Sequence, residues 1–173
     1  MSDKPIWALS ATELVKKTKN NDLSATEITF AYLEHIKTVN PELNAIVDDM
    51  SKEAIKRAEN LDSAAKSGDS KGRLFGVPVT VKINVDQKGY ATSNGVSALK
   101  NSIASQNAPI VDHLLNAGAI FVGRTNTPEF SFRAETENPL YGRTHNPWGK
   151  HLSPGGSSGG ASSAVMSGMC ALA

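Results

Sequence analysis

The sequence has no excess of charge of either sign. Eighteen lysines and arginines stand against 17 aspartates and glutamates, which leaves a formal net charge of +1. Proteins that bind chiefly nucleic acid or an anionic membrane gather phosphates with a basic surface field. Since that field is missing, we expect no direct nucleic-acid partner and no membrane partner.

Features of exported proteins are also missing. Cys170 is the only cysteine, so no disulfide can form within the chain, and no Asn-x-Ser/Thr glycosylation site occurs. Residues 1–5 carry no apolar core of a secretory signal. Because reduced cysteines are typical of the cytoplasm, we expect a cytoplasmic protein.

Several common catalytic and ligand-binding motifs are absent. None of the four histidines has a second ligand at a spacing typical of zinc sites. No Gly-x-Ser-x-Gly nucleophile elbow occurs, and no glycine-rich segment ends in the Gly-Lys-Ser/Thr of a phosphate-binding loop. We therefore expect no metal, no cofactor and no nucleotide site.

The residues that are present divide the chain into two regions. Residues 1–73 hold 23 of the 35 charged residues but only 2 of the 14 glycines, and residues 74–173 hold the rest. We therefore expect an N-terminal helical region over residues 1–72 and an α/β region over residues 73–173.

Helix signals fill the first region. Two S/T-x-x-E capping boxes, at Ser10 and Ser24, each predict the start of a helix. The apolar face after the second box should stop at Asn40-Pro41. A third helix is expected over residues 51–67, followed by a turn over residues 68–72.

The second region changes period. Apolar residues alternate with polar ones from Val77 to Val85, which predicts a strand with one apolar face. A short helix over residues 109–116 and a strand over 119–122 follow, an order that favours parallel strands. Residues 151–173 carry no formal charge, but serine, glycine and alanine dominate them, so we expect a closely packed buried helix rather than a membrane span.

Lys82 and the segment Ser153–Gly160 are the candidates for chemistry. Lys82 lies between Val81 and Ile83, where loss of hydration would lower its pKa and make its amine a general base. A strand lysine that reaches solvent is the alternative. The glycines of the segment allow close backbone approach. A flexible linker is its alternative, but the small and apolar residues behind it must pack.

Four motifs follow one another in the second region: Gly76–Lys82, Ala117–Glu129, Tyr141–Trp148 and Ser153–Gly160. In this order they closely resemble the motifs of the amidase signature family. The resemblance covers residues 73–173. It implies an α/β amidase signature fold, in which an N-terminal helical region precedes part of a mixed, largely parallel sheet with flanking helices.

The resemblance also implies a Ser–cis-Ser–Lys triad that hydrolyses a small-molecule amide through an acyl-enzyme, without a cofactor. Lys82 matches the catalytic lysine of the family, and Ser157 matches the bridging serine that follows a cis peptide bond. Gly155 and Gly156 match the glycines that tolerate this bond. Ser158 is expected to support the lysine by hydrogen bonding.

The family's nucleophile has no match in the chain. It is a serine in a Gly-Gly-Ser segment that follows the bridging serine by more residues than separate Ser157 from Ala173. We therefore expect the N-terminal part of a longer amidase, inactive alone, with the remaining C-terminal polypeptide as its partner. Met166, Met169 and Leu172 should then be exposed or covered by another polypeptide. Ile83 also departs from the acidic residue of many members.

Two other functions stay open. One is the amidase subunit of a tRNA-dependent amidotransferase, which passes ammonia from glutamine to a partner enzyme. The other is a non-catalytic binding module built on the Gly/Ser loop, complete in 173 residues. The sequence does not distinguish a monomer from a homo-oligomer.

Overall fold

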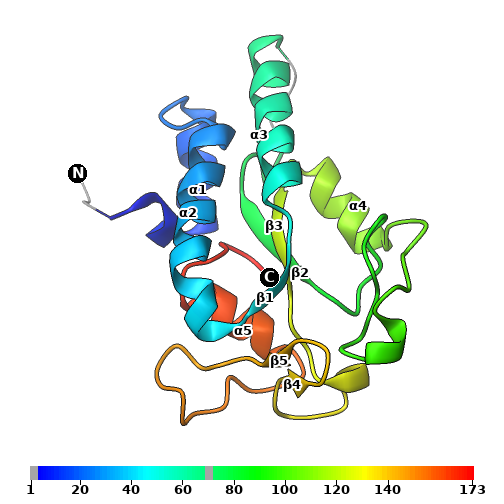
Figure 1. The fold of residues 1–173 in the computed structure, drawn as a ribbon. Helices are drawn as coiled ribbons and strands as arrows, with labels where there is room; N and C mark the ends of the chain where they lie inside the picture. The colour runs from blue at the N-terminus through cyan, green and yellow to red at the C-terminus, as the bar shows by residue number, and fades with distance from the viewer. Residues whose placement is uncertain (1–3, 69–71) are drawn as a thin grey trace.

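The protein is an α/β structure in which helices pack against both faces of a small sheet. A computed structural model describes residues 4–68 and 72–173. Figure 1 shows α1 and α2 on one side of the sheet and α4 on the other. The helices are α1 Ala11–Lys19, α2 Ala25–Leu43, α3 Ser51–Lys66, α4 Pro109–Asn116 and α5 Gly159–Met166, with short 3-10 turns at Ile6–Ala8, Ser97–Leu99 and Glu129–Ser131.

Both predicted capping boxes are confirmed. The hydroxyls of Ser10 and Ser24 accept the backbone N–H of Glu13 and Glu27, whose carboxylates accept the serine N–H groups in return. The helices α1 and α2 therefore begin where the sequence indicates. The third helix, α3, also agrees with its prediction. Residues 69–71 of the expected turn lie outside the described residues.

The predicted stop of α2 at Asn40-Pro41 is wrong. The helix continues through Pro41 to Leu43, whose side chain is buried. It ends at Asn44, which adopts a left-handed conformation and donates its N–H to the Asn40 carbonyl at 2.8 Å. One missing hydrogen bond near the end of a helix is tolerated when the last turn is capped and packed in this way.

The main sheet has the strand order β1-β3-β2, formed by β1 Ile46–Asp49, β3 Ile120–Thr125 and β2 Pro78–Lys82. Strands β2 and β3 are parallel and are joined through α4, as predicted. The sequence did not predict β1, which pairs with β3 in antiparallel direction and makes the sheet mixed. A second, two-stranded sheet joins β4 Glu137–Asn138 to β5 Gly142–Arg143.

The prediction of one apolar and one polar face for β2 is wrong. Every residue from Pro78 to Val81 is buried, and the strand ends at Lys82. The reason is that the core continues on both faces of the sheet. On β3, Ile120 and Val122 join a cluster with α2 and α3, while Phe121 joins one with α4 and β2.

Residues 171–172 form a further neighbour of β2. Leu172 pairs with Val79 in parallel direction, Ala171 donates its N–H to the Pro78 carbonyl, and Thr80 donates its N–H to the Leu172 carbonyl. As expected, Met166 and Leu172 are exposed, at 58% and 39%. Met169 is fully buried and corrects the expectation for that residue, because it packs in the cluster around α2. Among the described residues, no helix has the length and apolar character that would cross a membrane.

Arg124 is a buried cation at the centre of the sheet. Its guanidinium donates to the Asp48 carboxylate at 3.0 Å and to the carbonyls of Ala91 and Val85 at 2.7 and 2.9 Å. It thus joins β1, β3 and the loop that follows Lys82. Removing one partner of such a pair leaves a poorly hydrated charge and unpaired carbonyls.

We expect Arg124→Met to lower the free energy of unfolding by about 3 kcal/mol in urea denaturation. The matched control is Arg143→Met, because Arg143 pairs with Glu135 at 2.6 Å but both side chains are more than a third exposed. Its effect should stay below about 1 kcal/mol. Equal losses in the two variants would contradict a special role for the buried pair.

Candidate active site

Lys82 and Ser157 meet where β2 ends and the Gly/Ser segment passes the sheet. The Lys82 Nζ donates hydrogen bonds to Ser157 Oγ at 2.8 Å and to Ser158 Oγ at 3.2 Å. Seventy-five residues separate Lys82 from Ser157 along the chain. The three polar side chains that the sequence singled out therefore form one cluster.

The electrostatics of the cluster favour a neutral amine. Lys82 is half-buried, and burial lowers the pKa of its ammonium from the ordinary lysine value. Its strand neighbour Ile83 is fully buried and supplies no charge. Among the ion pairs of residues 4–68 and 72–173, none involves Lys82. No carboxylate therefore counteracts the cost of burying the charge.

Two glycines let the backbone approach Ser157 closely. Gly155 adopts a φ of +82°, and the peptide bond between Gly156 and Ser157 is cis. A Cβ on Gly156 would lie 2.4 Å from the carbonyl oxygen of Arg133, so a side chain there would displace the neighbouring loop. Both glycines thus stand beside the serine they were expected to support.

Ser158 is the N-cap residue of α5, yet its side chain makes no capping bond. Its hydroxyl oxygen accepts from Lys82 instead. The helix is fixed at this end by the N–H of Gly159, which donates to Thr136 Oγ1 at 3.0 Å. The expected burial of this helix holds for its first turn, where Gly159 and Gly160 are buried, whereas Val165 and Met166 at its far end are exposed.

A second group of polar residues at the site was not predicted from the sequence. Thr127 Oγ1 donates to the Ser157 carbonyl at 3.0 Å and contacts Ser131 Oγ at 3.1 Å. Ser131 Oγ in turn accepts from the side-chain amide of Asn84 at 3.2 Å. The uninterrupted polar run from Arg124 to Thr127, directly at the carboxyl end of an apolar strand, is the signal that could have indicated them.

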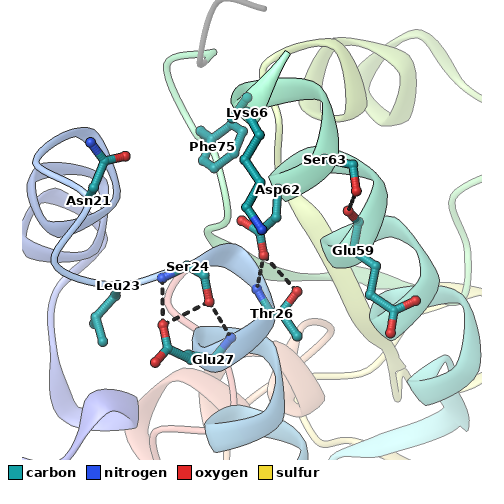
Figure 2. Close-up of a pocket in the computed structure, with 11 residues that line it drawn as sticks. Asn21, Leu23, Ser24, Thr26, Glu27, Glu59, Asp62, Ser63, Lys66 and Phe75 are labelled. Atoms are coloured by element: carbon teal, nitrogen blue, oxygen red, sulfur yellow. Dashed lines mark hydrogen bonds between the residues drawn. The ribbon is translucent and has the colours of Figure 1, made fainter. Parts of the chain in front are cut away.

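The pocket in Figure 2 lies away from this cluster. It measures about 550 Å³, and α2, α3 and the turn before α2 line it. Its Asp62 carboxylate accepts the N–H groups of Ala25 and Thr26 and the hydroxyl of Thr26, at 2.9, 2.9 and 2.6 Å. Asp62 therefore caps α2 from a neighbouring helix, which is a structural role.

The cluster around Lys82 is suited to proton transfer. A neutral amine 2.8 Å from a hydroxyl can take its proton, and that hydroxyl can take a proton from a third group. Within the described part of the chain, no group of three or more histidines, cysteines or carboxylates is placed to hold a metal ion. The chemistry available from these residues is thus that of a base and a relay.

Comparison with known proteins gives consistent matches. The family model Amidase matches residues 27–173. Indoleacetamide hydrolase of Bradyrhizobium diazoefficiens is 48% identical over 169 residues, which are 98% of this chain and 32% of that protein. A glutamyl-tRNA(Gln) amidotransferase subunit of Caldanaerobacter subterraneus is 38% identical and is covered to 34% by 97% of this chain.

Solved structures agree with these sequence matches. A bacterial aryl acylamidase of the amidase signature enzymes superposes with a TM-score of 0.92 at 30% identity, covering 96% of this chain and 35% of that one. The chain therefore spans about a third of the length of the proteins it matches.

Proposed function

Because this chain belongs to the amidase signature family, we propose that it supplies part of the active site of an enzyme that hydrolyses the amide bond of a small molecule. The four sequence motifs indicated this family, and the α/β fold agrees with them. The observation that carries the proposal is the hydrogen bond of 2.8 Å between the half-buried Lys82 amine and Ser157.

In the proposed reaction, neutral Lys82 is the base and Ser157 the relay. Lys82 takes the proton of Ser157 Oγ while Ser157 takes the proton of a nucleophilic serine. That serine attacks the amide carbonyl and forms an acyl-enzyme. The proton returns through Ser157 to the amide nitrogen as the C–N bond breaks, and water then releases the carboxylic acid. Ser158 holds Lys82 through its second hydrogen bond, and Gly155 and Gly156 leave room for the relay segment.

The nucleophile of this proposal lies beyond Ala173, in a C-terminal polypeptide that completes the α/β core begun by residues 73–173. Two observations support this placement. The chain spans about a third of its relatives. Leu172 pairs with Val79 in parallel direction, so residues that follow it in the same register run beside β2 toward Lys82. On this proposal residues 1–72 remain an N-terminal region and the 173-residue chain is inactive alone.

A second candidate is the amidase subunit of a tRNA-dependent amidotransferase, located in the cytoplasm. The observation in its favour is the 38% identity to a glutamyl-tRNA(Gln) amidotransferase subunit. In that case the amide is glutamine, and the ammonia passes to a partner enzyme. A hydrolase of free amides needs no such partner.

The test is an assay of the complete polypeptide that carries this chain. Indole-3-acetamide, an N-acylated aniline and glutamine are supplied separately, and the carboxylic acid and amine products are measured by mass spectrometry. We expect hydrolysis of at least one free amide and none by residues 1–173 alone. Glutamine cleavage that depends on added partner subunits would favour the amidotransferase. Failure to cleave any amide would favour the binding module.

A further inference from the structure

A chain of hydrogen bonds joins the two halves of the candidate site from behind. It begins at the side-chain amide of Asn84, passes through the hydroxyls of Ser131 and Thr127, and ends at the backbone carbonyl of Ser157. Its three donor–acceptor distances are 3.2, 3.1 and 3.0 Å. None of these three side chains contacts the Lys82 amine through a hydrogen bond of the described residues.

The direction of the chain follows from the number of protons available. A carbonyl oxygen can only accept, so the single hydroxyl proton of Thr127 is committed to Ser157. Thr127 Oγ1 must then accept the proton of Ser131, and Ser131 accepts from the amide of Asn84. Hydrogen bonds aligned in this way polarise and strengthen one another.

Thr127 is held rigidly. Its side chain is fully buried, its N–H donates to Asn126 Oδ1 at 3.0 Å, and its carbonyl accepts from Asn138 Nδ2 at 2.7 Å. Asn138 Nδ2 also donates to Asn126 Oδ1 at 2.7 Å. A hydroxyl fixed at both ends of its residue is well suited to fix a third group.

Ser131 reaches Thr127 through an unusual backbone. Phe130 and Ser131 have φ values of +50° and +62°, a left-handed conformation that two consecutive non-glycine residues rarely adopt. The Phe130 N–H donates to the Asn94 carbonyl at 3.0 Å and holds the turn. The left-handed turn thus places the Ser131 hydroxyl between Asn84 and Thr127.

We propose that Thr127 is a positioning residue for Ser157, and that Ser131 and Asn84 act through it. Asn84 follows Lys82 by two residues, so the chain braces the strand that carries the amine and the segment that carries the relay hydroxyl at the same time. Its function is to hold the Lys82–Ser157 distance. This inference rests on the proposed function of those two residues.

The decisive variant is Thr127→Val, which removes the hydroxyl and keeps the shape of the side chain. We expect kcat of the complete enzyme to fall about tenfold, because one hydrogen bond that fixes Ser157 is lost. KM should change less than about twofold, since Thr127 is buried and does not face substrate. Thr127→Ser restores the hydroxyl and should recover most of kcat.

The matched control is Thr29→Val. Thr29 is also fully buried, but it lies on α2 and its hydroxyl has no hydrogen-bond partner among the described residues. It should therefore leave kcat unchanged. Ser131→Ala breaks the chain one link earlier, and in combination with Thr127→Val it should add little further loss, because both variants interrupt the same chain.

The outcomes separate this inference from the proposed function. If Lys82→Ala abolishes hydrolysis while Thr127→Val keeps full kcat, the positioning role is overturned and the base–relay pair stands. If Lys82→Ala is fully active, the proposed function itself fails. Additive losses in the Thr127→Val/Ser131→Ala pair, or no recovery with Thr127→Ser, would also overturn the chain. Thermal melting of each variant identifies any that fail to fold, and Ser131→Ala, at a partly exposed site, then decides by its own loss of kcat.

Discussion

Replacing Lys82 with alanine should lower kcat/KM for amide hydrolysis by the complete enzyme about 10⁴-fold, the upper end of the usual contribution of a general base. The reason is that Lys82 is the only group hydrogen-bonded to Ser157 Oγ among the described residues. Without its amine the relay has no final acceptor for the proton. Residual activity would come from binding and from charge stabilisation elsewhere in the site.

The pH profile gives this prediction its sign. Only neutral Lys82 can accept a proton, and burial lowers its pKa, so kcat/KM of the wild type should rise with pH through that lowered pKa. Lys82→Ala should remove the rise. Lys82→Arg should not restore it, because a guanidinium stays protonated. Lys88→Ala, at an exposed lysine six residues away, is the control and should keep both rate and profile. An unchanged profile in Lys82→Ala would make the lysine a structural strand residue.

Ser157→Ala is expected to lower kcat/KM about 10²–10⁴-fold, since it removes the hydroxyl through which the proton must pass. The loss should appear in kcat and not in KM. Ser158→Ala should cost less, because its bond to Lys82 is longer, at 3.2 Å against 2.8 Å, and only supports the base.

Ser162→Ala controls for loss of a serine hydroxyl in the same segment. Ser162 is exposed on α5, and its hydroxyl donates only to the Ser158 carbonyl one turn earlier. Steady-state rates for the three alanine variants should therefore follow the order Ser162→Ala, Ser158→Ala, Ser157→Ala, from fastest to slowest. A Ser157→Ala enzyme as fast as Ser162→Ala would exclude the relay.

Local interactions made much of this fold predictable from the sequence. The capping boxes at Ser10 and Ser24 act within four residues, so their pattern already contains the bonds that form. The helix α4 and its flanking strands follow from apolar periodicity and from the handedness of parallel connections. The Lys82–Ser157 contact was accessible only through resemblance, because periodicity alone left a solvent-exposed lysine open.

Distant interactions decided what could not be predicted. Strand β1 is four residues long and lies among helices, and its pairing partner β3 is far away in the sequence. The extension of α2 past Pro41 depends on burial of Leu43. The role of Thr127 depends on a carbonyl 30 residues away and on a turn with left-handed backbone. No local pattern contains these contacts.

The central position of β3 has a consequence for how the molecule folds. β3 joins β1 and β2, and residue 172 joins β2, so each pairing brings together segments that are far apart in the chain. Closing such loops costs chain entropy before the contacts stabilise them, which makes high-contact-order pairings slow. Helices such as α1 and α2 need only local bonds and form on much shorter timescales. The contact between Lys82 and Ser157 therefore belongs to the late stage of folding, and a collapsed helical intermediate of this chain would already be compact while having no base next to its relay.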